Sequence, residues 1–175
     1  MKRLFVLFLV LAFSASVFAF GQGTKTVGGF IGYSSSKANS DADPLSTIII
    51  NPMGGYFFID NLCADLEIEY LSMNADYLDD PITEFGLGLG GRYFYMDFYG
   101  GAAFMMSSWN DGDYKYSANY LKFRLGYLVK IAENIYVDLG AHYKMGLGAY
   151  GGDMDEFDNE ESEINIGGGV DIFFP

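Results

Sequence analysis

The sequence predicts an all-β fold: a closed, antiparallel, up-and-down barrel of eight strands that follows an N-terminal signal peptide. Three observations support this prediction. The first residues have the pattern of an export signal, the remaining chain divides into segments of alternating apolar and polar residues, and the connections between segments are short and long in turn. The 175 residues, 18% of them aromatic, with 23 Gly and only 4 Pro, suit a single β domain.

The N-terminus has the three parts of an export signal. A basic pair at 2–3 precedes an apolar run at 4–13, and small residues then lead to Ala19, which would stand just before the cleavage site. An N-terminal membrane anchor is the alternative, but an apolar run of this length is too short to span a bilayer comfortably. We therefore expect a signal peptide, 1–19, followed by one barrel domain, 20–175. No later stretch is long and apolar enough to predict a transmembrane helix.

The barrel domain divides into eight candidate strands. They are 24–35, 47–59, 62–73, 83–95, 98–108, 116–131, 135–148 and 163–174. In the third, sixth, seventh and eighth segments, apolar residues occupy every second position, which is the period of a strand with two different faces. In the fourth segment the alternation places glycines at 86, 88 and 90 on the same face as Glu84 and Arg92. The first, second and fifth segments are defined by the connections that flank them.

The connections between the segments alternate in length. Three are of hairpin length, 60–61, 96–97 and 132–134, and contain Asp or Asn, which tolerate the positive φ of tight turns. The other four are longer and polar: 36–46, 74–82, 109–115 and 149–162. Short turns at one end and long loops at the other are typical of barrels in the bacterial outer membrane. With an even strand number and a periplasmic N-terminus, the long loops face the outside.

The direction of the polar face distinguishes a transmembrane barrel from a soluble one. In a soluble barrel the apolar side chains point inward, whereas in a transmembrane barrel they contact lipid and the polar side chains fill the lumen. Glycines among charged residues suit a crowded, narrow interior better than a solvated surface. The polar faces also carry nearly balanced charge, as a poorly hydrated lumen requires. Their six acids and five bases are Asp65, Glu67, Glu69, Glu84, Asp138 and Asp171, and Arg92, Lys122, Arg124, Lys130 and Lys144.

Charge and size exclude two classes of function. The formal net charge is −13, and the surplus acids lie mainly in the long loops. Nucleic-acid binding is therefore excluded, because phosphate contacts need basic residues. A wide pore is excluded because eight strands leave an interior just large enough for side chains. Aromatic residues near the strand ends, among them Tyr93, Tyr95 and Phe98, fit interfacial girdles, although Tyr and Phe favour strands in any setting.

Two segments carry a resemblance to a known family. The segments 55–62 (GYFFIDNL) and 131–138 (IAENIYVD) look like strand–periplasmic turn–strand hairpins. In them the sequence resembles the eight-stranded outer-membrane β-barrel family, which includes the OmpX/Ail-like proteins and the OmpA transmembrane domain. The resemblance implies a location in the outer membrane, contact with its lipid and lipopolysaccharide, and recognition of an aromatic C-terminal strand by the barrel assembly machinery. Phe173 and Phe174 match that signal, but the sequence given ends at Pro175, which departs from it.

Candidate catalytic residues are few. His142 is the only histidine, and we expect it to face the lumen and to hydrogen-bond there with a carboxylate such as Glu67 or Asp138. No serine is clearly placed beside it, and the motifs of serine hydrolases and zinc proteases do not occur. The single cysteine, Cys63, excludes an internal disulfide and is expected to be a small apolar side chain.

The last long loop contains the one candidate metal site. Asp153, Asp155 and Asp158 belong to an acidic cluster whose carboxylates could hold a divalent cation and bridge it to anionic lipopolysaccharide. The spacing is not that of an EF-hand, because the glycine at its sixth position is missing. A solvated acidic loop is the simpler interpretation.

These observations predict a monomeric, non-enzymatic outer-membrane barrel with a structural or cell-surface interaction role and no cofactor. Its lumen is plugged by structural charges, namely Asp65, Glu67, Glu69, Glu84, Arg92, Lys122, Arg124, Asp138, His142 and Lys144. Two alternatives stay open. One is a soluble periplasmic β-barrel that binds a small apolar ligand, and the other is a barrel enzyme that modifies lipids of the outer membrane.

Overall fold

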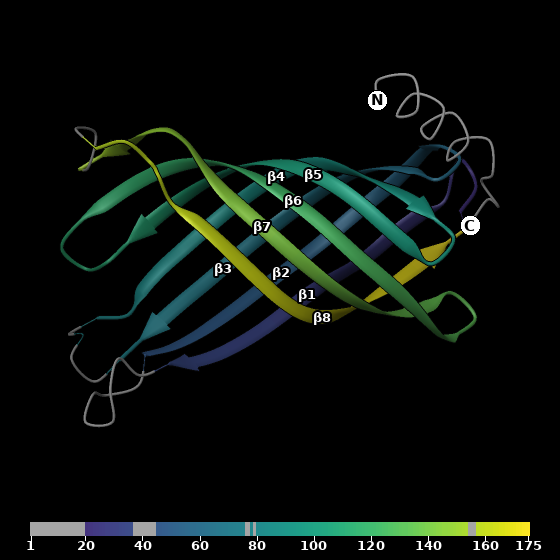
Figure 1. Cartoon of the computed structure of the whole chain (residues 1–175), viewed down its shortest axis with the longest axis horizontal. Helices are drawn as coiled ribbons and strands as arrows, with labels where there is room; N and C mark the ends of the chain where they lie inside the picture. The colour runs from purple at the N-terminus through teal and green to yellow at the C-terminus, as the bar shows by residue number, and fades with distance from the viewer. Residues whose placement is uncertain (1–19, 37–44, 76–77, 79, 154–156) are drawn as a thin grey trace, which may run out of the picture.

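The computed structural model describes residues 20–36, 45–75, 78, 80–153 and 157–175, and these form a closed antiparallel barrel (Figure 1). Each strand pairs with its neighbours in the sequence, and the first pairs with the last, so the prediction of an all-β, eight-stranded, up-and-down barrel is confirmed. The strands are β1 (Lys25–Ser36), β2 (Leu45–Ile59), β3 (Leu62–Asn74), β4 (Ile82–Tyr95), β5 (Phe98–Asn110), β6 (Lys115–Ala132), β7 (Ile135–Gly152) and β8 (Ser162–Phe174).

The N-terminal part of the sequence stays a prediction. The expected signal peptide, 1–19, lies outside the described residues. The part of the chain that the structure describes contains no helix long and apolar enough to cross a membrane.

The predicted strands lie within two residues of the observed ones, except at the end of β7. That strand continues to Gly152, four residues beyond the predicted end. It does so because pairing with β6 resumes after a bulge in β7: Leu147 pairs with Asn119, and Gly151 and Gly152 then pair with Ser117 and Tyr116. Positive φ angles at Gly148 (71°) and Gly152 (79°) accommodate the irregular backbone.

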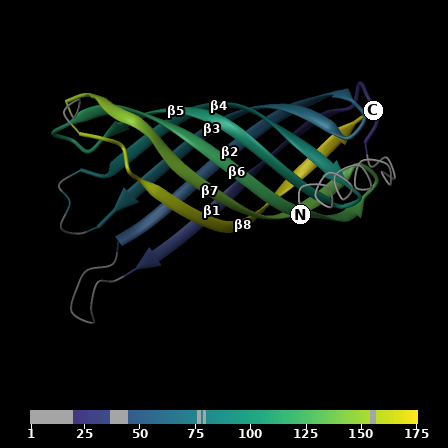
Figure 2. The same ribbon diagram turned by 45° about the horizontal axis from the view of Figure 1, so that its top comes forward.

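The three short turns lie at one end of the barrel, together with the C-terminus and the start of β1, and the longer connections lie at the other (Figures 1 and 2). We call these the turn end and the loop end. The left-handed conformation is supplied by Asn61 (φ 63°) and Asn134 (φ 116°), as the Asp/Asn content of the turns predicts. In the middle turn it falls on Met96 (φ 53°) and not on Asp97. Met96 is the first residue of its two-residue turn, whereas Asn61 is the second residue of its turn.

The apolar face of each strand points outward and the polar face points into the lumen. In β3, Leu66 and Ile68 are 60% and 40% exposed, whereas Glu67, between them, is 1% exposed. Large apolar side chains are exposed in this way on every strand, from Val27 in β1 to Phe174 in β8. The outer wall is therefore apolar all round, which is the arrangement of a barrel that contacts lipid.

The inward glycines make room for the charged side chains. A Cβ at Gly88 would lie 2.5 Å from Cγ of Glu67, and a Cβ at Gly28 would overlap the carboxylate of Asp171. These glycines share the lumen face with the charges, as the alternation of the fourth segment predicts for Gly88. Without them, the long acidic side chains could not lie against the inner wall.

The seam between β1 and β8 closes the barrel with the shortest ladder. Only seven residue pairs join these strands, from Lys25 with Phe174 to Ile31 with Gly168. The backbones approach closely, because a Cβ at Gly169 would lie 1.8 Å from the carbonyl oxygen of Gly29. Since no hairpin turn connects β1 to β8, contacts inside the lumen must help to hold this seam.

We predict that Met96→Asn stabilises the barrel by about 1 kcal/mol, because a left-handed conformation costs an ordinary residue roughly 1–2 kcal/mol and asparagine less. The measurement is the urea midpoint of the purified protein, followed by the different gel mobilities of unheated folded and unfolded barrel. Met96→Val is the matched comparison and should lower the midpoint, because a β-branched residue tolerates positive φ poorly. Equal midpoints for the two variants would contradict this explanation of the turn.

Candidate functional site

The lumen is filled by a continuous chain of nine charged side chains in which acids and bases alternate. We call it the ionic ladder. Among the described residues it contains eight salt bridges, and every link joins one acid to one base. In order from the turn end to the loop end, its members are Asp171, Arg92, Asp65, Arg124, Glu67, Lys122, Glu69, Lys144 and Glu84.

Arg92 anchors the turn-end half of the ladder. Its Nε and Nη2 donate to the two carboxylate oxygens of Asp65 at 2.9 and 3.1 Å, and its Nη1 donates to Asp171 at 2.9 Å. The guanidinium carbon also lies 5.2 Å from the ring centroids of both Phe94 and Tyr99. A planar, always charged group with five donors can satisfy two carboxylates and two ring faces at once, which lysine cannot do. Arg92 therefore ties β4 to β3 on one side and to β8 across the lumen.

Two lysines continue the ladder toward the loop end. Lys122 Nζ donates to Glu67 at 3.0 Å, to Glu69 at 2.7 Å and to the side-chain oxygen of Asn51 at 3.2 Å. Lys144 Nζ donates to Glu69 at 2.9 Å and to Glu84 at 2.5 Å. All of these groups are almost completely buried, so each ammonium exchanges its water for two or three fixed acceptors. The lysines join β6 to β3, and β7 to both β3 and β4.

The structure places the expected lumen charges inside the barrel, with one exception among the bases. Lys130, which shares the polar face of β6, is exposed near the turn end and has no place in the ladder. The alternation of β6 continues past the enclosed part of the lumen, so the pattern alone could not distinguish Lys130 from Arg124. Asp138 lies beside the ladder, where it accepts a hydrogen bond of 2.7 Å from the hydroxyl of Tyr99.

An aromatic plug closes the lumen at the turn end. The buried rings of Phe57, Phe94 and Phe173 pack there with Cys63, Tyr99 and Leu128. Phe20 completes the plug from outside the strands: its ring stacks on Phe173 with centroids 3.9 Å apart. Its carbonyl oxygen accepts a hydrogen bond of 2.9 Å from the backbone N–H of Asn61 in the first turn. The first described residue of the chain therefore helps to seal the barrel.

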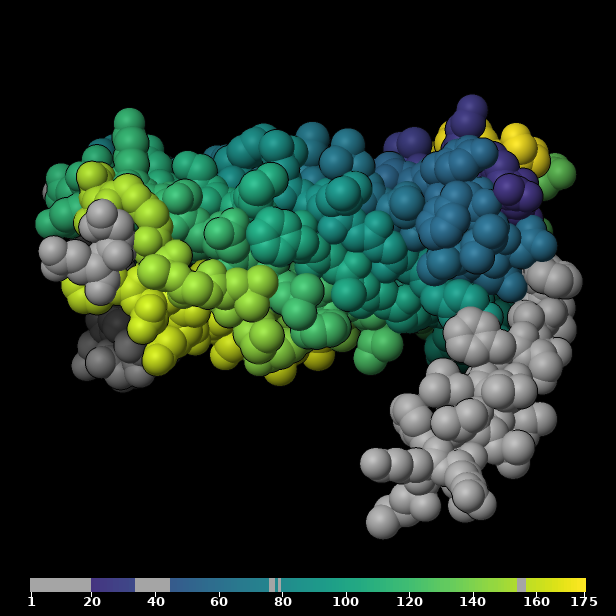
Figure 3. Space-filling view, turned by 90° about the horizontal axis from the view of Figure 1, so that it is seen from above, coloured from purple at the N-terminus to yellow at the C-terminus, as the bar shows by residue number. Residues whose placement is uncertain are grey.

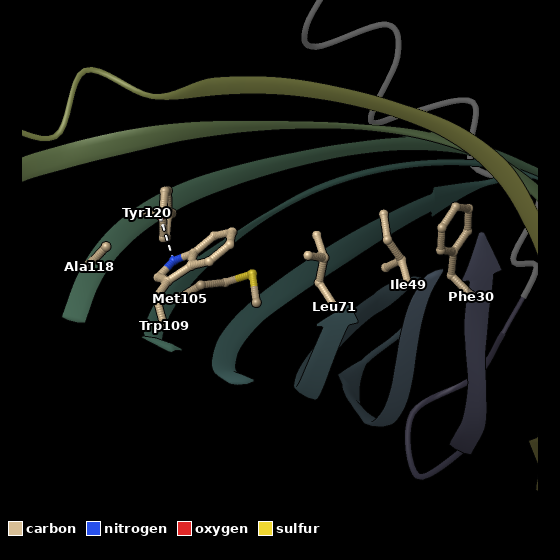
Figure 4. Close-up of a cluster of buried hydrophobic side chains, with 7 residues drawn as sticks. All are labelled: Phe30, Ile49, Leu71, Met105, Trp109, Ala118 and Tyr120. Carbon is tan, nitrogen blue, oxygen red and sulfur yellow. Dashed lines mark hydrogen bonds between the residues drawn. The ribbon is translucent and has the colours of Figure 1, made fainter. Parts of the chain in front are cut away.

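A second buried cluster fills the lumen toward the loop end (Figure 4). Figure 4 shows its seven side chains in a row across the inner wall, from Ala118 and Tyr120 to Phe30. The indole Nε1 of Trp109 donates to the hydroxyl of Tyr120 at 3.1 Å, and that hydroxyl donates to Glu161 at 2.7 Å. The Lys144 ammonium lies 4.3 Å from the ring centroid of Tyr120. The ladder thus ends against aromatic rings at both ends.

His142 and Cys63 lie inside the barrel without the surroundings of a catalytic group. The His142 ring packs against Phe30 at a centroid distance of 5.0 Å, and no hydrogen bond to the expected Glu67 or Asp138 is formed. The Cys63 thiol is fully buried and donates to a carboxylate oxygen of Asp65 at 3.3 Å. A buried thiol beside a carboxylate is a poor nucleophile, because both surroundings disfavour the thiolate.

The acidic residues of the last connection are only partly described. Asp153 caps the start of β6, where its carboxylate accepts a hydrogen bond of 2.8 Å from the Lys115 N–H. Asp158 pairs through its backbone with Ala149, and Asp155 lies outside the described residues. In the described part of the chain, no three His, Cys, Asp or Glu side chains are grouped to hold a metal ion.

A solved structure shares this barrel. The crystal structure of Neisserial surface protein A (NspA) superposes with a TM-score of 0.55 and covers 86% of this chain and 96% of the NspA chain. Sequence identity is 18%, so the likeness concerns the fold alone. No protein-family model matches the sequence, and the search of curated proteins finds no match. The fold is thus supported independently of the strand pattern, whereas membership of the OmpX/Ail-like group stays a prediction.

Several lumen residues have no signal in the sequence. Asn51 and Tyr99 bind members of the ladder or its neighbours, yet a single polar or aromatic residue in a strand does not indicate its partner. Trp109 and Tyr120 are aromatic residues of two different strands, and nothing in the sequence indicates that they hydrogen-bond to each other. Phe20 lies before the first predicted strand, and its role depends on how the chain folds back over the lumen.

Replacing Arg92 with alanine should destabilise the barrel by about 3–5 kcal/mol, because Asp65 and Asp171 would each lose a buried counter-charge. The urea midpoint of the folded form measures the loss. Lys130→Ala is the control, since this exposed base should change stability by no more than about 0.5 kcal/mol. Arg92→Lys keeps the charge but not the bidentate geometry, and should fall between the two. Similar midpoints for Arg92→Ala and Lys130→Ala would contradict the structural role of the ladder.

Truncating the plug residue Phe20 to alanine should cost about 2–3 kcal/mol, the free energy of burying an aromatic side chain together with its ring contacts. Phe20→Leu should lose less, since it keeps most of the apolar volume. Gln22→Ala is the comparison, because Gln22 is exposed on the same segment and its side chain loses only one exposed hydrogen bond, from Nε2 to the Phe58 carbonyl oxygen. The same unfolding measurement applies, and an unchanged midpoint for Phe20→Ala would show that the plug does not need this ring.

Proposed function

We propose that the protein is an exported, non-enzymatic barrel of the bacterial outer membrane with a structural or cell-surface interaction role. The observation that carries the proposal is the combination of an apolar outer wall with a lumen filled by paired charges. A wall of this kind needs lipid around it, and a lumen of this kind leaves no space for a wide pore. The signal peptide at 1–19 would supply the export route.

The apolar wall argues against the soluble alternative. A soluble ligand-binding barrel would turn Leu66 and Ile68 toward an internal cavity and Glu67 toward water, and the structure has the reverse orientation. In water, this wall would expose apolar side chains from all eight strands, far beyond the patches that soluble monomers tolerate.

The enzyme alternative gains no support from the site. A lipid-modifying barrel would need a nucleophile and a base within hydrogen-bond reach of each other. His142 packs against Phe30 and pairs in the sheet with Arg124, between the two buried clusters of the lumen, and no nucleophile is hydrogen-bonded to it among the described residues. We therefore assign the buried charges a structural role.

We propose separate partners for the outer wall, for the loop end and for the C-terminal strand of the barrel. The wall contacts outer-membrane lipid, and the acidic loop end faces lipopolysaccharide, where divalent cations could bridge the two anionic surfaces. Phe174 is half-exposed on the outside of β8, where the barrel assembly machinery could read it, whereas Phe173 points into the aromatic plug. The similarity to NspA, which its name describes as a surface protein, is consistent with a role of the loops at the cell surface. We propose that the barrel acts as a monomer.

The orientation can be tested with single cysteines, because the native Cys63 is fully buried and should not react. Asp113→Cys introduces an exposed thiol at the loop end, and Glu133→Cys introduces one at the turn end. On intact cells, a membrane-impermeant maleimide should label Asp113→Cys but not Glu133→Cys, and both should react after the outer membrane is permeabilised. The unmodified protein is the control and should stay unlabelled in both cases.

Two outcomes would contradict the proposed location. One is labelling of Glu133→Cys on intact cells, which would show that the turn end faces the outside. The other is recovery of the protein in the soluble periplasmic fraction without detergent, together with identical gel mobility of heated and unheated samples.

A further inference from the structure

We propose that a groove on the outer wall, near the turn end, binds one acyl chain of a phospholipid of the periplasmic leaflet. The inference rests on the proposed membrane location and adds a defined lipid site to it. The groove has a volume of about 1090 Å³ and crosses the wall from β4 to β8. Figure 3 shows part of this wall in space-filling form, between the turn end on the right and the loop end on the left.

The strand register explains why a groove exists there. Three neighbouring rows of paired residues run side by side across β4 to β8 and supply all the lining residues. The upper wall is the outward row Tyr93–Gly100–Leu125–Ala141–Ile166. The lower wall begins with the outward row Tyr95–Phe98–Tyr127–Leu139. Between them, the floor is the row Tyr99–Gly126–Gly140–Gly167, whose side chains point inward.

The floor is low because its side chains point inward, so that only backbone faces outward, and the packed lumen requires glycine at three of its four positions. A Cβ at Gly126 would lie 2.3 Å from the Tyr99 ring, and a Cβ at Gly167 would lie 2.3 Å from the Phe30 ring. Small outward residues, Gly100 and Ala141, lower the upper wall beside the floor. The outer wall is thus hollowed where an inward row adjoins an outward row that contains small residues.

The groove is inclined in the direction that an acyl chain would take. It begins at Tyr93, three residues from the turn at Met96, and ends at Ile166, eight residues from the end of β8 at Phe174. Four inter-strand steps of about 4.8 Å give it a length of about 19 Å. If the strands tilt by about 35–45°, the groove descends roughly 11–13 Å along the barrel axis, about half of the ~25 Å apolar band of such a barrel. One groove therefore spans one leaflet.

The uncharged lining favours a lipid chain, and the position of the groove near the turn end favours the chain of a phospholipid. None of the lining residues is charged. Tyr93 and Tyr95 lie at its turn-end mouth, the depth at which amphipathic rings meet lipid headgroups, and Tyr127 lies along the lower wall. The turn end faces the periplasm in the proposed orientation, so the adjoining leaflet consists of phospholipid, whereas lipopolysaccharide lies at the loop end.

Ala141→Phe fills the groove from the outside, where it should displace the chain without entering the ionic ladder. Ala64→Phe is the matched control, because Ala64 is an exposed, outward residue of β3 away from the groove. Each full-length protein would be purified in nanodiscs of phosphatidylethanolamine and phosphatidylglycerol, transferred to mild detergent and examined by native mass spectrometry. We expect one retained phospholipid per barrel in the original protein and in Ala64→Phe, and at least a tenfold lower retained fraction in Ala141→Phe.

A second measurement locates the chain. A photoreactive amino acid at position 125, on the upper wall, should crosslink to phospholipid in the same nanodiscs more than one at position 66, on the outward face of β3. Equal retention by Ala141→Phe and Ala64→Phe, retention of detergent only, or equal crosslinking at the two positions would overturn the proposal. Failure of the proposed membrane location is distinguishable, because it would show in the maleimide labelling and in the gel mobility, whatever lipid is retained.

Discussion

The pairing of buried charge is the constraint on which the rest of this barrel depends. An interior of eight strands is too narrow to hydrate nine ionised side chains, so each must find its partners within the protein. The alternating order achieves this because every base lies between two acids. The links also cross the lumen, so that the same contacts that neutralise charge join β3, β4, β6, β7 and β8. Charge neutralisation and cross-bracing are therefore one structural feature.

The large side chains of the lumen in turn determine where the inner wall must carry glycine. Glu67 and Tyr99 each lie over a residue of the neighbouring strand, and Gly88 and Gly126 leave the space that they need. The shape of the outer surface has a separate cause, because the side chains of the inward rows do not reach it. The hollow between β4 and β8 lies where the outward row beside an inward row contains the small residues Gly100 and Ala141. The inward and outward rows of one strand therefore shape the two surfaces of the barrel separately.

The parts of this structure that follow from local pattern could be predicted, and the parts that follow from register could not. Alternation in β3 distinguishes Leu66 from Glu67 without knowledge of any neighbour, and Asn61 and Asn134 supply the positive φ expected of their turns. The alternation does not state where the enclosed lumen ends, so Lys130 is indistinguishable from the ladder bases. The extension of β7 depends on a bulge between Leu147 and Gly151, and the alternation of residues does not show that pairing with β6 resumes after it. Even the correct set of lumen charges does not reveal which acid meets which base.

The closing seam shows how local and distant contacts combine. In seven of the eight adjacent strand pairs, the two strands follow each other directly in the sequence. The strands β1 and β8 are instead separated by the whole length of the barrel domain. Their ladder is short, and two contacts inside the lumen lie beside it: the Arg92–Asp171 ion pair from β4 to β8, and the stacking of Phe20 on Phe173. Phe20 precedes β1 and Phe173 lies at the end of β8, so their rings bring the two ends of the domain together at the turn end. The predicted cleavage after Ala19 would leave this pair intact in the mature chain, so the residue that export processing would make N-terminal also helps to close the barrel.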